Sequence, residues 1–149
     1  MQKITLFSLL ICCAGMYAQE QLLSSIDQFS VGTGNFENAF GYNYEYDAND
    51  NLISESGFSW NSSTSQWVPS NRDIYQYNAN GRASELTSQV YDSNTDSFVN
   101  DFRDLYTYDS NSSPIEVIYQ EFINGSYENE FRLTATYSNN NLISFIEYE

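Results

Sequence analysis

The sequence contains no histidine and very few cations. Its 149 residues include five Lys plus Arg against 20 Asp plus Glu, which gives a formal net charge of −15 at pH 7. A nucleic-acid partner would require a basic surface to bind its phosphates, so this charge balance argues against that class of partner. Without His, the chain also lacks the usual general base at neutral pH and the commonest metal ligand.

Cysteine is confined to Cys12 and Cys13, inside a segment with the layout of a secretory signal peptide. Lys3 precedes an uncharged apolar stretch that is too short to span a bilayer. We expect residues 1–18 to be removed and residues 19–149 to form one domain. The mature chain would have four arginines against 20 acids, a net charge of −16, and no thiol. The protein is therefore expected outside the cell or at its outer surface.

A lipid anchor on one of these cysteines is the alternative reading of the same segment. Bacterial lipid attachment favours a small residue directly before the cysteine, and Ile11 precedes Cys12. The sequence thus favours secretion over a lipoprotein.

Aromatic residues make up 17% of the chain and recur at a fixed interval. The motif Tyr-x-Tyr followed by Asp or Asn returns every 31 residues, and two further aromatic series keep this step, one of them ending two residues short. Series that share one register indicate tandem repeats, here starting near residues 29, 60, 91 and 122. The series are Tyr44, Tyr75 and Tyr106; Tyr46, Tyr77 and Tyr108; Phe29, Trp60, Tyr91 and Phe122; and Phe36, Trp67, Phe98 and Tyr127.

Each repeat predicts two strands joined by tight turns. Aromatic residues between Phe98 and Tyr108 fall on alternate positions, which is the period of a strand and not of a helix. Clusters of Asn, Asp, Ser and Gly separate the segments, and these residues are typical of hairpin turns. With a lead-in strand that ends near Phe29, we expect nine antiparallel strands, an all-β meander in a single curled sheet. A small up-and-down barrel with the aromatic residues inside is the alternative.

Regular pairing across the turns predicts which side chains share a face. Pairing Tyr77 with Ala83, and Trp60 with Trp67, fixes the register and places Glu55 opposite Arg72. One face would then hold the tyrosine series together with Trp60, Trp67 and the other turn-side aromatics. The arginines and most aliphatic residues would lie on the opposite face.

The repeat motif resembles the YD repeats of the RHS class. Tyr-x-Tyr-Asp-x-Asn-x-Asn at residues 44–51 carries the resemblance, with echoes at Tyr75 and Tyr106. The spacing Trp-x6-Trp followed by Arg-x2-Tyr-x-Tyr is similar, more closely, to secreted repeat proteins of Bacteroidetes bacteria. The resemblance covers residues 29–149 and implies a strip of β-hairpins outside the cell or at its surface. It implies no particular activity.

The aromatic series offer candidate binding residues. Exposed Tyr and Trp side chains give a large contact area for sugars or peptides at a low cost in ordering. The tyrosine series is better explained by cross-strand packing, which stabilises a sheet by itself. Trp60 and Trp67 flank a turn and are the candidates for contact with a glycan or protein partner.

Two acidic turns match the opening of a calcium-binding loop, in which alternating oxygen ligands face one ion. Neither turn has Gly at the sixth position or an acid at the twelfth, and hairpin turns rich in Asn and Asp explain both without a metal. We therefore expect no cofactor and keep calcium as a weaker hypothesis. The residues are Asp47, Asn49 and Asn51, and Asp92, Asn94 and Asp96.

A small secreted hydrolase of glycosidase type is the alternative function, since such enzymes need two carboxyl groups across a sugar. Asp101 with Asp104, and Glu128 with Glu130, are possible pairs. With 20 acids in the chain such pairs arise by chance, and none has a catalytic spacing. We therefore expect a secreted or cell-surface protein with a binding or structural role and no catalysis.

An open meander would leave two edge strands with unpaired backbone groups. These edges are expected near residues 22–29 and 142–148. The C-terminal edge is apolar. It contains neither Pro nor Lys, the two residues that most often prevent another strand from adding to an edge. We expect it to pair with the first strand in a barrel, with a second copy, or with an extended partner segment.

Overall fold

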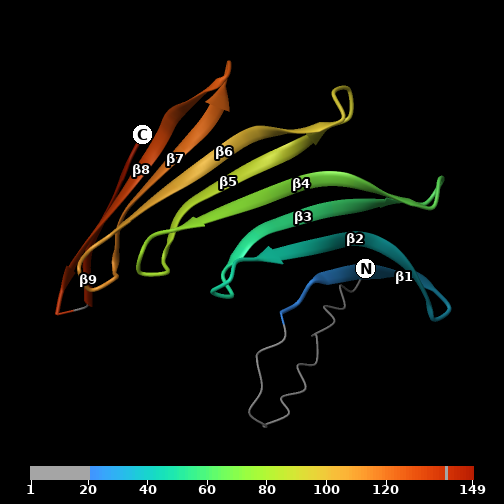
Figure 1. The fold of residues 1–149 in the computed structure, drawn as a ribbon, viewed down its shortest axis with the longest axis horizontal. Helices are drawn as coiled ribbons and strands as arrows, with labels where there is room; N and C mark the ends of the chain where they lie inside the picture. Colours follow the sequence, from blue (N-terminus) through green and yellow to red (C-terminus); the bar gives the residue numbers. More distant parts are fainter. Residues whose placement is uncertain (1–20, 140) are drawn as a thin grey trace, which may run out of the picture.

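A computed structural model describes residues 21–139 and 141–149, so the expected signal peptide at residues 1–18 lies outside the described residues. The described chain forms one antiparallel sheet whose strands follow each other in sequence order (Figure 1). The predicted meander of nine strands is confirmed, and the sheet is open, which excludes the barrel. The strands are β1 (Ser24–Gly32), β2 (Asn35–Tyr46), β3 (Leu52–Asn61), β4 (Gln66–Tyr77), β5 (Ala83–Asp92), β6 (Ser97–Tyr108), β7 (Pro114–Ile123), β8 (Ser126–Ser138) and β9 (Asn141–Tyr148).

The sheet is a single layer without an apolar core. Among the described residues no hydrophobic side chain is buried, and the buried polar residues are Ser54 and Ser88. Aromatic pairs beside the turns replace core packing: Trp60 and Trp67 meet edge to face with ring centroids 5.0 Å apart, and Phe122 and Tyr127 repeat that distance. Cross-strand pairs of this kind, added to the backbone ladder, are what stabilises a sheet of one layer.

Asx residues build the turns at one end of the sheet. The Asp47 Oδ1 atom accepts hydrogen bonds from the backbone N–H groups of Asn49 (2.8 Å) and Asn51 (2.9 Å). Asn78 and Asp109 form the same pair of bonds in the next two turns. These side-chain bonds imitate a backbone turn, so the Asp or Asn of the repeat motif has a structural role.

The second tyrosine of each motif closes the end of a strand pair. The Tyr77 hydroxyl donates a hydrogen bond of 2.8 Å to the Leu52 carbonyl, and Tyr108 donates one of 2.8 Å to the Ala83 carbonyl. Each bond joins the last residue of one strand to the first residue of its neighbour. The hydroxyl thereby satisfies a carbonyl at the point where the regular ladder ends.

Every hairpin contains a β-bulge. The register predicted from the sequence assumed regular pairing outward from each turn and therefore contained none of these bulges. The pairs Tyr77 with Ala83 and Trp60 with Trp67 are confirmed. Further from the turn, one strand always carries an extra residue. The extra residues form two series, Ala39, Ser70, Asp101 and Glu130 near one end and Ile53, Ser84, Ile115 and Ile143 near the other.

These bulges overturn the predicted distribution of side chains between the two faces. Because Ser70 is the extra residue of β4, Glu55 lies opposite Asp73 instead of Arg72. An inserted residue moves all following side chains to the other face, so the predicted pairing of Glu55 with Arg72 is wrong.

The tyrosine and tryptophan series, predicted to share a face, therefore lie on opposite faces. We call one the tyrosine face, which carries Tyr44, Tyr75 and Tyr106 together with Glu55, Asp73 and Asp104. We call the other the arginine face, which carries Trp60, Trp67, Arg72, Phe98, Arg103 and Tyr127.

Candidate functional site

Arginine side chains pack against aromatic rings along the arginine face. The Arg72 guanidinium lies 4.6 Å from the centroid of the Phe98 ring, and the Arg103 guanidinium lies 4.1 Å from the centroid of Tyr127. A guanidinium over an aromatic face is a cation–π contact, which here joins strands that are not neighbours in the sheet.

Each of these arginines is also held by a chain of hydrogen bonds. The Arg72 Nε atom donates to Gln89 Oε1 at 2.9 Å, and Gln89 Nε2 donates to Asn100 Oδ1 at 2.8 Å. The next repeat has the same trio, in which Arg103 donates to Gln120 and Gln120 donates to Asn129, both at 2.6 Å. These bonds stabilise the sheet, and in the middle repeats the three polar side chains fill this part of the arginine face.

The first repeat departs from this pattern at all three positions. Gly41, Phe58 and Pro69 stand 31 residues before Arg72, Gln89 and Asn100 respectively. The three polar side chains that are hydrogen-bonded to one another in the next repeat are thus all replaced by small or apolar residues in the first.

A hollow of about 210 Å³ lies on the arginine face where the first arginine is missing. The Trp67 indole rests on Gly41, with ring carbons 3.3–3.5 Å from the position that a Cβ at residue 41 would occupy. A Cβ at residue 41 would therefore require the indole to shift by a few tenths of an ångström. The lining consists of Ile26, Phe58 and Trp67 as large apolar groups, with Gly41, Tyr42, Ser24, Ser25 and Asn43.

The structure brings the two predicted binding residues together but divides their roles. Trp67 lines the hollow, whereas Trp60, directly opposite on β3, packs against the Trp67 ring outside the lining. Sequence reasoning missed Ile26, Gly41 and Phe58. The break in the repeat at positions 41 and 58 was the signal that could have found them.

The calcium candidates lie in two turns at opposite ends of the sheet. Asp47 and Asp92 both use their carboxylates within the turn: Asp47 Oδ2 accepts the Asn51 amide at 2.9 Å, and Asp92 Oδ2 accepts the Thr95 hydroxyl at 3.0 Å. In the described part of the chain no three His, Cys, Asp or Glu residues are grouped as a metal site would require. Asn49 and Asn94 contribute backbone N–H groups to these turns, and Asp96 accepts the Tyr91 hydroxyl. Calcium binding stays a prediction for these loops.

Carboxylates on the tyrosine face are partly withdrawn from water. Burial, assisted by the charge of Asp73, raises the pKa of Glu55, and burial also raises the pKa of Asp104. The Tyr106 hydroxyl donates to Asp104 at 3.1 Å, and burial together with this carboxylate raises the pKa of Tyr106 to about 12. The paired acids Asp101 and Asp104 do not converge, because Asp101 is the extra residue of its bulge and Asp104 is not.

The free energy of unfolding is expected to pass through a maximum below pH 7. Glu55 and Asp104 have raised pKa values in the folded state, so the folded chain binds more protons and gains stability as pH falls toward these values. Hydrogen bonds within the turns lower the pKa values of Asp47 and Asp92. These two carboxylates therefore stabilise the folded chain while they are ionised, and this stabilisation is lost when they are protonated at still lower pH. Urea unfolding midpoints across the acidic range measure this. Asp104→Asn should flatten the rise, and a steady fall in stability from pH 7 downward would contradict the expectation.

Comparison with known proteins identifies a family. The family model of DUF3836, a family of unknown function, matches residues 18–100. A crystal structure of a protein with unknown function from Bacteroides fragilis has 17% sequence identity and a TM-score of 0.67, and the match covers 76% of this chain and 84% of that chain. This likeness concerns the fold alone. No curated protein matches the chain.

Two solved structures carry the name of the same family. A DUF3836 family protein from Bacteroides vulgatus is 18% identical, with 74% of this chain and 98% of that chain covered and a TM-score of 0.46. One from Parabacteroides distasonis is 18% identical, with 83% and 89% covered and a TM-score of 0.45.

The resemblance to RHS and YD repeats is wrong. The matching family model is DUF3836, and nothing in the comparisons points to an RHS protein. The residues that suggested it have structural roles here, in the Asx turns and in the tyrosine bonds that close the strand pairs. Within residues 21–139 and 141–149, no helix has the length and apolarity of a membrane span. The family model matches more than half of the length of this chain, and the chain therefore belongs to the DUF3836 family, a family of unknown function.

Proposed function

We propose that this protein is a secreted binding module without catalysis, and that it binds a neutral saccharide in the hollow at Trp67. The observation that supports this most is the loss of the arginine trio in the first repeat. Gly41 and Phe58 leave the Trp67 indole and an apolar floor in the place that Arg72 and Gln89 fill in the next repeat.

The lining of the hollow fits a sugar ring. An indole face packs against the C–H face of a pyranose, and hydroxyl and amide side chains pair with its hydroxyl groups. Ser24 on β1 and Asn43 on β2 supply such polar groups, whereas the Ser25 hydroxyl is turned to the tyrosine face and pairs with the Tyr44 hydroxyl. A few polar groups over an apolar floor are typical of small-ligand sites.

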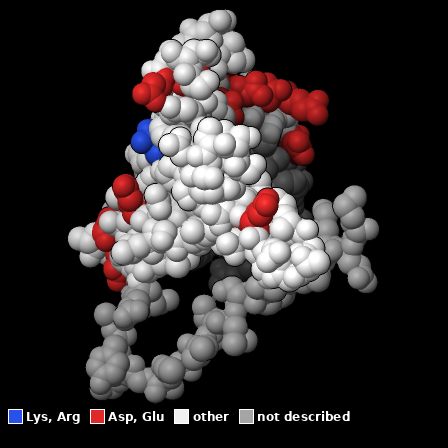
Figure 2. Space-filling view, turned by 90° about the vertical axis from the view of Figure 1, so that its right-hand side faces the viewer, with Lys and Arg blue, Asp and Glu red and all other residues white. Residues whose placement is uncertain are grey.

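The charge of the protein favours a neutral ligand over an anionic one. Among the residues that the structure describes, no Asp, Glu, Lys or Arg lines the hollow. Acidic side chains outnumber basic ones on the face at the hairpin tips (Figure 2), and the whole chain has a net charge of −15. Because this field repels polyanions, an uronic-acid polymer is disfavoured relative to a neutral glycan.

The test is a glycan array followed by fluorescence titration of the tryptophans with the oligosaccharides it selects. Trp67→Ala should weaken binding at least tenfold by removing the stacking surface. Gly41→Arg, which introduces the residue of the other repeats, should block the hollow while the sheet stays folded. Phe98→Ala is the matched control, since it removes the equivalent ring of the next repeat.

Two results would overturn this proposal. Binding that Phe98→Ala weakens as much as Trp67→Ala would place the ligand elsewhere on the sheet. A glycosidase screen of the same samples addresses the hydrolase alternative: turnover of any sugar that Asp104→Asn abolishes would show catalysis.

A further inference from the structure

The last strand, β9, is an open edge flanked by exposed apolar side chains. Ile143 is 63% exposed, Phe145 is 59% exposed and Leu142 is 55% exposed. Between Ser144 and Tyr148, β9 pairs with β8 without irregularity. A regular, apolar edge is a template for another strand.

The first strand, at the opposite edge, is poorly suited to the same role. Its pairing with β2 is interrupted twice, near Asp27 and near Val31, whereas the pairing of β9 is interrupted once. Bulges and charged residues on an edge are the devices by which native sheets discourage strand addition. The two edges are therefore not equivalent.

The number of strands decides how two copies can join. In an antiparallel meander of nine strands, β1 and β9 run in the same direction. Adding β1 of one copy to β9 of another by simple continuation of the sheet would create a parallel pair. Pairing β9 with β9 of a second copy, around a two-fold axis perpendicular to the sheet, continues the antiparallel pattern and gives a closed, isologous contact.

We infer that β9 pairs antiparallel with β9 of a second copy and forms a dimer with a continuous sheet. This inference is independent of the proposed saccharide site, which lies near the other edge. The partner is a second copy because pairing β9 with β9 about a two-fold axis keeps neighbouring strands antiparallel. The same pairing keeps each face of the sheet on one side across the dimer.

A register centred on Phe145 satisfies the face and charge requirements together. Antiparallel partners share a face, so Phe145 lies opposite Phe145 of the second copy, and the overlap covers residues 143–147, since Leu142 lies beyond the bulge at Ile143. Glu147 then lies opposite Ile143, so no carboxylate faces another directly. A register centred on Glu147 would place like charges opposite each other, which destabilises a strand pair.

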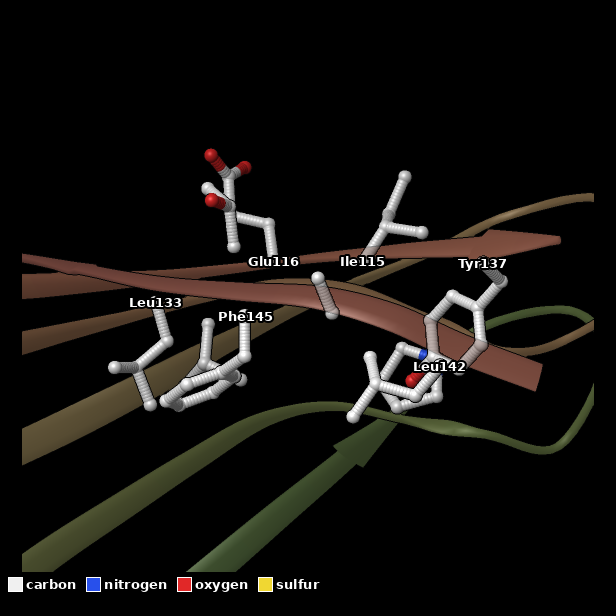
Figure 3. A pocket seen from close by; sticks show the side chains of 10 residues that line it. Ile115, Glu116, Leu133, Tyr137, Leu142 and Phe145 are labelled. Carbon is white, nitrogen blue, oxygen red and sulfur yellow. The ribbon is translucent and has the colours of Figure 1, made fainter.

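An apolar groove beside β9 gives this register a packing contribution. Leu133, Tyr137, Leu142 and Phe145 project to one side of the sheet, away from Glu116, and line a groove of about 220 Å³ (Figure 3). In the dimer the second Phe145 would lie beside this groove and extend its apolar surface across the two-fold axis. Aromatic pairs directly opposite each other are among the favourable cross-strand pairs.

The experiment combines sedimentation velocity with cysteine cross-linking, in a chain whose Cys12 and Cys13 are changed to Ser. A dimer should appear as concentration rises, and more readily at high salt because the acidic subunits repel each other. Phe145→Cys should give a covalent dimer with a short bismaleimide cross-linker, which adds one thiol to each of its two double bonds, in much higher yield than Glu147→Cys. Ile26→Cys on β1 is the control and should stay monomeric. Phe145→Lys should raise the dissociation constant at least tenfold.

Two outcomes would overturn the inference. One is a monomer at every concentration and salt, with no cross-linked product at Phe145→Cys. The other is a dimer that Phe145→Lys leaves unchanged, or that cross-links at Ile26→Cys instead, which would place the contact away from β9.

Discussion

A chain from which Ser70 is deleted is expected to lose about 4 kcal/mol or more of its free energy of unfolding. Ser70 is the extra residue of the bulge in β4. Without it, Asn71 and every later residue of β4 would either pair one position along or turn to the opposite face. Arg72 and Tyr75 would then point to the wrong sides of the sheet. Total stabilities of small domains are about 5–15 kcal/mol, and the described residues of this one form no apolar core that could offset such a loss.

The control for this deletion is a shortened turn in the same hairpin. Residues 62–65 join β3 to β4, whereas Asn124 and Gly125 alone join β7 to β8. Replacing residues 62–65 by Asn-Gly removes two residues but keeps the register, so a cost of about 1 kcal/mol is expected. Urea unfolding of both variants measures the difference. Equal losses would show that the bulge does not fix the faces.

Replacing Arg103 by Ala is expected to cost about 2 kcal/mol, because its side chain connects four strands. The Nε atom donates to Gln120 on β7 at 2.6 Å, and the guanidinium lies 4.1 Å from the Tyr127 ring centroid on β8. One guanidinium nitrogen lies 3.9 Å from Glu85 on β5. In a sheet of one layer, such cross-strand contacts provide the stabilisation that an apolar core provides in other folds.

Two further variants separate charge from geometry at this position. Arg103→Lys keeps the charge but loses the planar fork, and should recover less than half of the lost stability. Arg82→Ala removes an exposed arginine from a turn and should change stability by less than about 0.5 kcal/mol. If Arg82→Ala costs as much as Arg103→Ala, then net charge rather than contact geometry is responsible.

The sequence by itself determined the number of strands, their order and the turns between them. Strand period, turn composition and the 31-residue step are local properties, because each is set by residues close together in the chain. Tyr77 with Ala83 and Trp60 with Trp67 pair as predicted, since each pair directly flanks its turn. The same locality made the turn-flanking Trp60 and Trp67 visible as an aromatic pair.

Only the tertiary structure decided which side chains share a face. The bulge residues Ala39, Ser70, Asp101 and Glu130 have no chemical feature in common, so the sequence does not mark them. A single extra residue reverses the phase of everything beyond it, and an error of one position therefore exchanges the two faces. The arginine trios and the hollow at Gly41 depend on that phase. They are formed by residues from several strands, whose alignment is fixed only when the whole sheet has paired.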